Sequence, residues 1–312
     1  MIAGRMSRGF LVCMAMGLIL AACGNRSRAE MILVPNASFE SPDAPYVSVN
    51  VDSWQKVPKP DWYVESGGFL WDYNVGLFEN PLTNTSGHID NCDGNQAVWL
   101  FVVPEVALFQ DYDSTDWRSP APTHEFDATF EAGRSYQLTV GVIGTGGGMQ
   151  QGAALELSLY YRDDNSNRVT VAAVSLTNTT AVFSNNTHLL DFHVNVSAVR
   201  PGDAWAGRHI GIQMLSTVDP ALEGGYWDLD NVRLSSTLEP ILLDPVWTNS
   251  QFQFTLRSEP GLAIEILSAT NPILPLSNWT SLGSLTNISG MTPFADSVAS
   301  GARRYYCARR LP

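Results

Sequence analysis

Lysine is almost absent from this 312-residue sequence, which contains only Lys56 and Lys59. Acidic residues outnumber Lys and Arg by 31 to 18, and the formal net charge is -13. Because nucleic-acid binding needs a basic surface that neutralises phosphates, nucleic acid is not expected as a partner. Charged residues make up only 16% of the chain and hydrophobic residues 45%, so the composition excludes a charge-rich disordered protein.

Long hydrophobic runs are also lacking, apart from one at the N-terminus over residues 10–22. This run follows two arginines, has the length of a signal-peptide core, and is short for a transmembrane helix. It ends in Leu20-Ala21-Ala22-Cys23-Gly24, which resembles the lipobox of bacterial lipoproteins. The sequence therefore predicts a signal peptide over residues 1–22 and a lipid anchor on Cys23. Glycine after this cysteine favours the outer membrane and cell surface, whereas cleavage after Ala29 with plain secretion is the alternative.

Cysteine is scarce, with four residues in the whole sequence. Cys13 belongs to the predicted signal peptide and Cys23 to the predicted anchor, which leaves Cys92 and Cys307 in the mature chain. An exported protein can form disulfides, but these two residues lie far apart in the sequence. Two separate thiols are therefore expected, and pairing is left open.

Helical periodicity is missing, and alternation with period two takes its place. Leu155, Leu157 and Leu159, for example, alternate with the more polar Glu156 and Ser158. The candidate strands of the larger part of the chain are 32–40, 96–103, 105–110, 135–143, 153–161, 169–176, 189–196, 209–215 and 226–234. Gly-, Asn- and Asp-rich turns separate many of these runs. The pattern predicts an all-β fold, an antiparallel jelly-roll β-sandwich.

A connector bracketed by two prolines at 238–245 divides the sequence into a larger unit, 32–237, and a smaller unit, 246–312. The smaller unit has candidate strands at 251–257, 262–268, 279–284 and 303–308. These are enough for a small second β-sandwich.

Four motifs of the larger unit occur in an informative order. They are Asn36-Ala-Ser-Phe-Glu40, Asp93-Gly-Asn-Gln96, Glu131-Ala-Gly-Arg-Ser-Tyr136-Gln-Leu-Thr-Val140 and Tyr226-Trp-Asp-Leu-Asp-Asn-Val-Arg-Leu234. In this order they resemble the galactose-binding-like jelly roll. Residues 32–236 are similar to the xylan- and glucan-binding carbohydrate-binding modules of bacterial enzymes and to the hapalindole-type cyclases.

The smaller unit carries a second resemblance, on Phe252-Gln-Phe254, Trp279-Thr-Ser-Leu282 and Arg304-Tyr-Tyr306. It is similar to a C-terminal module of secreted proteins of the Verrucomicrobia and Planctomycetes. This resemblance implies a small fibronectin-III-like β-sandwich that serves as a spacer or attachment unit. The arginine usual in the last strand of that module is replaced here by Cys307.

The resemblance to the sugar-binding modules implies a structural Ca²⁺ held by Glu40 and Asp230. These residues belong to the first and last motifs, which lie close together in this fold. Two buried carboxylates would repel each other unless a cation or a shared proton intervened, and Ca²⁺ prefers such oxygen ligands. The alternative is that Asp230 and Asn231 only bond to the backbone of the final strand.

Aromatic residues crowd the segment 54–73, where the strand pattern is poor. An indole ring exposed on a loop can pack against the apolar face of a pyranose, while amide and carboxylate groups bind the hydroxyls. The sequence therefore predicts a protein that binds a polysaccharide or glycan. The candidate stacking residues are Trp62, Trp71 and Trp99, and the candidate polar partners are Asp72, Asn74 and Gln96.

Catalytic signatures are absent: the sequence has no Gly-x-Ser-x-Gly motif and no histidines at metal-ligand spacing. The resemblance to the cyclases implies one enzymatic alternative, a cyclase-like or lyase-like enzyme with a general acid in the jelly-roll pocket. Alternation places Asp228 and Asp230 on the same face of the last strand, so Asp228 is the candidate acid. A structural envelope or adhesion protein is the third hypothesis.

Overall fold

The computed structural model describes residues 29–116, 118–119, 121–249, 251–297 and 304–311. The predicted signal peptide and its anchor residue Cys23 lie outside the described residues. Among the described residues, three short 3-10 helices occur, η1 (Trp71–Asn74), η2 (Pro220–Leu222) and η3 (Leu276–Asn278), and all other regular structure is strand. Within the described part of the chain, no helix has the length and apolarity needed to cross a membrane.

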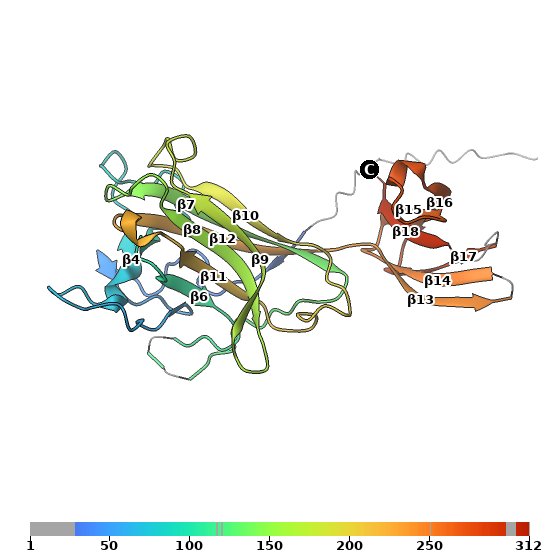
Figure 1. Ribbon diagram of the computed structural model, residues 1–312, viewed down its shortest axis with the longest axis horizontal. Coiled ribbons are helices and arrows are strands. Elements are labelled where there is room, and N and C mark those ends of the chain that lie inside the picture. The colour runs from blue at the N-terminus through green and yellow to red at the C-terminus, as the bar shows by residue number, and fades with distance from the viewer. Residues whose placement is uncertain (1–28, 117, 120, 250, 298–303, 312) are drawn as a thin grey trace, which may run out of the picture.

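The predicted antiparallel β-sandwich is confirmed, with two sheets in the larger unit (Figure 1). One sheet has the order β10-β7-β12-β5-β4-β2, with β1 also paired to β12. Its strands are β1 (Glu30–Ile32), β2 (Val47–Ser48), β4 (Val75–Glu79), β5 (Gln96–Phe101), β7 (Arg134–Gly146), β10 (Leu190–Val196) and β12 (Tyr226–Leu238). The other sheet has the order β3-β6-β11-β8-β9. Its strands are β3 (Gln55–Lys56), β6 (Ala107–Gln110), β8 (Ala154–Arg162), β9 (Arg168–Thr177) and β11 (Gly211–Ser216).

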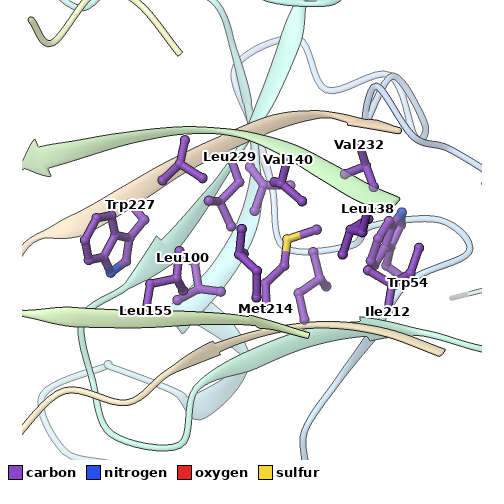
Figure 2. Close-up of a cluster of buried hydrophobic side chains, with 14 of the residues drawn as sticks. Trp54, Leu100, Leu138, Val140, Leu155, Ile212, Met214, Trp227, Leu229 and Val232 are labelled. Atoms are coloured by element: carbon purple, nitrogen blue, oxygen red, sulfur yellow. The ribbon is translucent and has the colours of Figure 1, made fainter. Parts of the chain in front are cut away.

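The main core lies between these two sheets and follows from the alternation seen in the sequence (Figure 2). Leu155 and Leu157 of β8 point inward and are fully buried, as are Leu138 of β7 and Trp227 and Leu229 of β12. Each such side chain contributes about 1.5–3 kcal/mol of transfer free energy relative to an exposed one. The strand that carries the last sequence motif is therefore anchored by its inward-facing residues.

The outer face of the β10-β7-β12-β5-β4-β2 sheet carries a second, smaller apolar cluster. It contains Ile89, Ala97, Ile143 and Leu189, with Phe78 packed against them. Two of these residues come from loops, so loops cover part of the outer face. The neighbouring part of the same face is hollow and forms the site described below.

The C-terminal unit is a small β-sandwich of two sheets, β13-β14-β17 and β16-β15-β18. Its strands are β13 (Ile241–Thr248), β14 (Gln251–Arg257), β15 (Leu262–Ala269), β16 (Thr280–Asn287), β17 (Met291–Asp296) and β18 (Tyr305–Arg310). The core contains Phe254, Leu256, Ile264 and Ile266. Strand β13 begins at Ile241, inside the predicted connector.

Pro245 is accommodated in β13 at a β-bulge, where the register with β14 shifts between Leu243 and Val246. A bulge is one of the few places where a strand tolerates a residue without an N–H group. The cysteines Cys92 and Cys307 are both free and half-buried.

Candidate functional site

A cavity of about 1020 Å³ opens on the outer face of the seven-stranded sheet, and we call it the outer-face cavity. Its floor consists of residues on four adjacent strands, β4, β5, β12 and β7. These floor residues are Phe78, Trp99, Phe101, Tyr226, Asp228 and Ile143. They are the outward members of the alternation whose inward members build the main core, so one pattern produces both the core and the cavity.

Asp228 is the acidic group of this floor. It pairs with Trp99 on β5 and with Ile143 on β7, which places it in the middle of the sheet. The residue as a whole is half-buried, but its Oδ1 atom is fully buried and has no hydrogen-bond donor in the described part of the chain. Burial raises the pKa of Asp228 to about 7, because a carboxylate without donors is poorly solvated there. A substantial fraction of this side chain is therefore a protonated acid near neutral pH.

The aromatic walls of the cavity are held in fixed positions. The Trp99 indole donates a hydrogen bond from Nε1 to the carbonyl oxygen of Tyr73, at 3.0 Å. The same ring lies over Gly76, where a Cβ atom would come within 2.4 Å of it. Phe101 and Tyr226 meet edge to face, with ring centroids 6.0 Å apart. These contacts make a rigid apolar surface around the acid.

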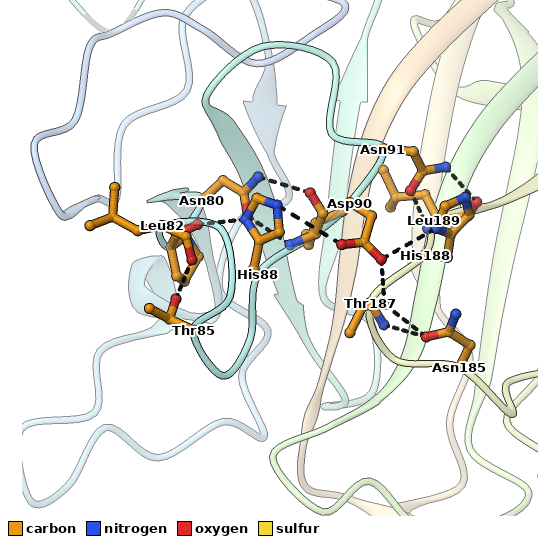
Figure 3. A network of polar contacts seen from close by, with 12 residues as sticks. Asn80, Leu82, Thr85, His88, Asp90, Asn91, Asn185, Thr187, His188 and Leu189 are labelled. Atoms are coloured by element: carbon orange, nitrogen blue, oxygen red, sulfur yellow. Dashed lines mark hydrogen bonds and ion pairs between the residues drawn. The ribbon is translucent and has the colours of Figure 1, made fainter.

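Two loops also line the cavity. One contains residues 81–87, and the other contributes Asn186. Asp90 joins them, because its main-chain N–H donates to the carbonyl of Thr187 at 2.8 Å and its carboxylate accepts from the Thr187 hydroxyl at 2.8 Å (Figure 3). Asn91 adds a two-way contact with the backbone of Leu189, at 3.0 and 2.8 Å. The two loops therefore form one braced wall.

Two histidines flank Asp90 in the same network (Figure 3). His88 Nε2 lies 4.0 Å and His188 Nδ1 lies 3.7 Å from the carboxylate. The hydrogen bond from Thr187, followed by contacts with His188 and His88, lowers the pKa of Asp90. Asp90 therefore stays anionic near neutral pH and continues to accept the Thr187 hydroxyl.

Only Trp99 among the predicted ligand-binding residues lines the outer-face cavity. Trp71 is 4% exposed and donates from Nε1 to the carbonyl of Val57 at 2.7 Å, so it is a core residue and not a stacking platform. Trp62 is 46% exposed and packs edge-on against Trp71, with ring centroids 6.2 Å apart. The aromatics of the 54–73 loop region thus pack partly on one another, which corrects the prediction for Trp71.

The predicted polar partners Asp72, Asn74 and Gln96 also lie outside the cavity. Gln96 is buried, and its amide group accepts from the main-chain N–H of Ala44 at 2.6 Å and donates to the carbonyl of Phe39 at 2.8 Å. Asn74 is buried and donates to the carbonyl of Trp71 at 3.0 Å. Both residues support the backbone, which corrects the prediction of a binding role for them. Asp72 is exposed, outside the cavity.

Glu40 and Asp230, the predicted calcium ligands, approach the same loop. The N–H of Asp93 donates to Asp230 Oδ2 at 2.6 Å, and the N–H groups of Asn95 and Gln96 donate to Glu40 Oε1 at 2.9 and 2.8 Å. Asp230 is fully buried, and burial raises its pKa to about 7 despite the N–H donors. The loop between these two carboxylates is therefore fixed by both of them.

The carboxylates of Glu40 and Asp230 suit a hard cation, but only if further oxygen ligands complete its coordination. Ca²⁺ takes six to eight oxygen ligands. No group of three or more His, Cys, Asp or Glu side chains with metal-binding geometry occurs in the residues that the structure describes. Glu40 and Asp230 bind main-chain N–H groups of the same loop, so backbone carbonyls and water would have to supply most ligands of a Ca²⁺ ion there.

The sequence analysis missed Phe101, Ile143 and Tyr226 as cavity residues. Their signal was present in the alternation, since Tyr226 has the same parity as Asp228, and Phe101 the same parity as Trp99. What the sequence lacked was the strand order, which brings β5, β12 and β7 side by side.

The solved structures with similar folds include cyclases and carbohydrate-binding modules. A cyclase from Fischerella sp. TAU aligns with 20% identity and a TM-score of 0.49, covering 68% of this chain and 98% of that one. The CBM22-1 xylan-binding domain of Paenibacillus barcinonensis Xyn10C aligns with 11% identity and a TM-score of 0.31, covering 62% and 92%. No curated protein matches the chain significantly.

A family model matches the same part of the chain. The HpiC1-like model, described as HpiC1 cyclase, matches residues 30–235. These residues contain every residue of the outer-face cavity and both sheets of the larger unit, apart from the last three residues of β12. Since the match covers more than half of the sequence, the chain belongs to the HpiC1-like cyclase family.

Proposed function

We propose that the outer-face cavity binds a largely apolar, unsaturated small molecule and that Asp228 protonates it, so that the protein is a cyclase-type enzyme working by general acid catalysis. The observation that supports this most directly is that Asp228 lines an aromatic cavity while its buried Oδ1 has no donor among the described residues. A carboxylic acid with a pKa near the working pH is an effective proton donor.

The proposed reaction is an isomerisation that needs no oxidant or cofactor. The Asp228 O–H gives its proton to a carbonyl oxygen or an alkene carbon of the substrate. A second C=C bond of the same molecule attacks the resulting cation and forms the new C–C ring bond. The positive charge then lies on the other carbon of the attacking C=C bond, and loss of a proton from a carbon next to it to the Asp228 carboxylate restores the acid and forms a new C=C bond. The aromatic rings of Trp99 and Tyr226 line the cavity, and an aromatic ring next to the intermediate cation would stabilise it through cation–π attraction.

The lining of the cavity favours an apolar ligand over a sugar. No Lys, Arg or Glu occurs among the described residues that line it, and its side-chain polar groups include Ser86, Thr145, Asn186 and Asp228. A pyranose needs several planar amide or charged partners for its hydroxyls, because each hydroxyl buried without a hydrogen bond is destabilising. An apolar ligand with one basic site beside Asp228 would leave fewer polar groups without a hydrogen bond than a pyranose would.

Trp99→Ala is expected to weaken ligand binding at least about tenfold, because it removes the largest wall of the cavity. Isothermal titration calorimetry with indole as the apolar probe measures this effect. Trp62→Ala serves as the matched control, since Trp62 is an exposed tryptophan outside the cavity, and it should bind indole like the wild type. Loss of indole binding in Trp62→Ala with wild-type binding in Trp99→Ala would contradict the site.

Carbohydrate binding is the second candidate function, and the exposed ring of Trp62 favours it. A sugar bound there would stack on the surface and not in the cavity. Titration with xylohexaose tests this candidate, since its heat would be lost in Trp62→Ala and kept in Trp99→Ala. A structural or adhesion protein would bind neither probe. Export, with lipid attachment at Cys23, stays part of the proposal for where the protein works.

Calcium binding at Glu40 and Asp230 also belongs to this proposal, in a structural role. Saturating Ca²⁺ is expected to raise the melting temperature, because a ligand at 100 times its Kd stabilises the folded state by about 2.7 kcal/mol. Melting curves with CaCl2 and with a chelator measure the shift. Asp230→Asn should lose most of it, and Asp191→Asn, on the surface of β10, should keep it. An equal shift in both variants would reject these ligands.

A further inference from the structure

The two loops that line the outer-face cavity are joined at three titratable side chains, His88, Asp90 and His188, which we call the Asp90 cluster (Figure 3). The first two residues belong to the loop after β4, and the third belongs to the loop before β10. The reaction proposed above uses none of these groups. Their geometry nevertheless couples them to the cavity, because each loop also supplies cavity residues.

The neutral ring of His88 turns a nitrogen without hydrogen toward a carboxylate. Its Nδ1 lies 2.6 Å from the carbonyl oxygen of Pro81, and because a carbonyl only accepts, Nδ1 carries the ring hydrogen. Nε2 therefore has a lone pair in the neutral ring, and it lies 4.0 Å from Asp90 Oδ1. A proton added at Nε2 converts this contact between a lone pair and an anion into an ion pair.

His188 approaches the same carboxylate from the second loop. Its Nδ1 lies 3.7 Å from Asp90 Oδ2, the oxygen that also accepts from the Thr187 hydroxyl at 2.8 Å. Within the described ranges, His88 and His188 are the titratable groups that act on Asp90. The Thr187 hydroxyl and then the histidines lower the pKa of Asp90, so this carboxylate stays charged between pH 5 and 8, where histidine ordinarily gains its proton.

The Asp90 cluster lies between buried anchors and exposed loop residues. Ile89 and Leu189 are buried in the smaller apolar cluster on the outer face of the sheet. Ser86, Gly87 and Asn186 are exposed and line the cavity. Contacts within the cluster therefore decide how firmly these exposed parts of the two loops are held beside the cavity.

We propose that the Asp90 cluster is a proton-operated clamp on the outer-face cavity, in which protonated His88 and His188 bind Asp90 and hold the two loops together. The clamped state is stabilised as the pH falls from 8 to 5, because it binds these protons more tightly, and it is weakened as the pH rises. A ligand that contacts both loops favours the same state, so protons and ligand strengthen each other's binding. This effect on ligand binding rests on the function proposed for the cavity, whereas the clamp itself does not.

Hydrogen exchange of the protein without ligand, followed by NMR, tests the clamp. The N–H of Asp90 donates to the carbonyl of Thr187 across the two loops. The N–H of Leu189 donates to the side chain of Asn91 across the same junction. The protection of these amides, corrected for the intrinsic exchange rate at each pH, should be about two- to fivefold higher at pH 5.5 than at pH 7.5, the size expected for a partly exposed ion pair.

The double variant His88→Asn/His188→Asn removes both protonation sites. An asparagine amide places an N–H near the position of Nδ1, so it can still donate to the Pro81 carbonyl, but it carries no charge. Its protection should be the same at both pH values. His193→Asn is the matched control, since His193 on β10 contacts Thr139 and lies outside the cavity. This variant should keep the wild-type pH dependence, and circular dichroism checks that both variants fold.

Indole titration in the Asp228→Asn background tests the effect on the cavity, because Asp228 then contributes nothing to the pH dependence. Indole should bind about two- to fivefold more tightly at pH 5.5 than at pH 7.5 in this background. The difference should disappear when His88 and His188 are also replaced by asparagine.

The clamp is overturned if wild-type protection does not change between the two pH values, or if the double variant changes as much as the wild type. Loss of the change in His193→Asn would also overturn it, because the effect would then not belong to the Asp90 cluster. Regulation of the cavity is wrong if protection depends on pH but indole affinity does not. Should no variant and no wild-type protein bind indole while protection still depends on pH, the proposed function of the cavity fails and the clamp stands.

Discussion

Asp228→Asn is expected to lower the rate of the proposed reaction by about 10²–10⁴-fold, the usual contribution of a positioned general acid. Asparagine fills the same space but cannot give up a proton to the substrate. Citronellal is a suitable probe, because its acid-catalysed cyclisation gives an isomer of the same mass that gas chromatography separates. The wild-type rate with this probe should fall as the pH rises above about 7, where Asp228 loses its proton.

The control for this experiment is Asp191→Asn, which removes a carboxylate from β10, the edge strand of the same sheet. Asp191 forms an exposed ion pair with Arg233 and does not line the cavity. Its rate should match that of the wild type. If Asp228→Asn turned over citronellal at the wild-type rate, the acid would have to be another group and the proposed mechanism would be wrong.

The strands of the larger unit were predictable where one face of a strand is buried and the other is not. In β8 the leucines 155, 157 and 159 all enter the core, as their spacing predicted. Strand β17 was not among the predicted strands, because Pro293 lies in its middle and proline argues against a central strand. The sheet order explains the exception: β17 is an edge strand beside β14, where a missing N–H leaves no partner unsatisfied.

Aromatic residues were harder to assign, because burial of a loop residue depends on contacts that its own segment does not reveal. Trp71 and Trp62 lie close together in the sequence, yet the first is buried and the second is exposed. Trp71 starts the 3-10 helix η1, which leads into β4 and turns the ring toward the core. Nothing in the local pattern distinguishes the two rings.

Asp228 could be found from the sequence, but its surroundings could not. Alternation correctly separates it from the inward-facing Trp227 and Leu229. Its paired neighbours, Trp99 on β5 and Ile143 on β7, lie more than 80 residues away in the sequence. Long-range strand pairing therefore decides whether this carboxylate meets water, a cation or an apolar cavity, and here it meets the cavity.

The same isolation of Asp228 predicts that its replacement stabilises the folded protein at alkaline pH. The pKa of Asp228 is about 7 in the folded state, above the ordinary value of 3.8. A group whose pKa rises on folding destabilises the protein once it is ionised in the unfolded state, and this cost grows from pH 3.8 until the folded form also ionises near pH 7. An asparagine side chain at this position would carry no such cost, because its amide does not ionise.

Asp228→Asn should accordingly gain about 2–4 kcal/mol of unfolding free energy at pH 8 and almost none near pH 4, by the linkage between pKa and stability. Because the residue is half-buried, solvent screening favours the lower end of this range. Urea unfolding of both proteins at the two pH values measures the difference, and Asp191→Asn should show no gain at either. A gain of the same size at pH 4 and pH 8 would mean that the amide improves packing and that Asp228 is not an isolated acid. A gain confined to pH 8, together with lost turnover, would mean that the fold tolerates an unfavourable carboxyl group in the place where the reaction needs a proton.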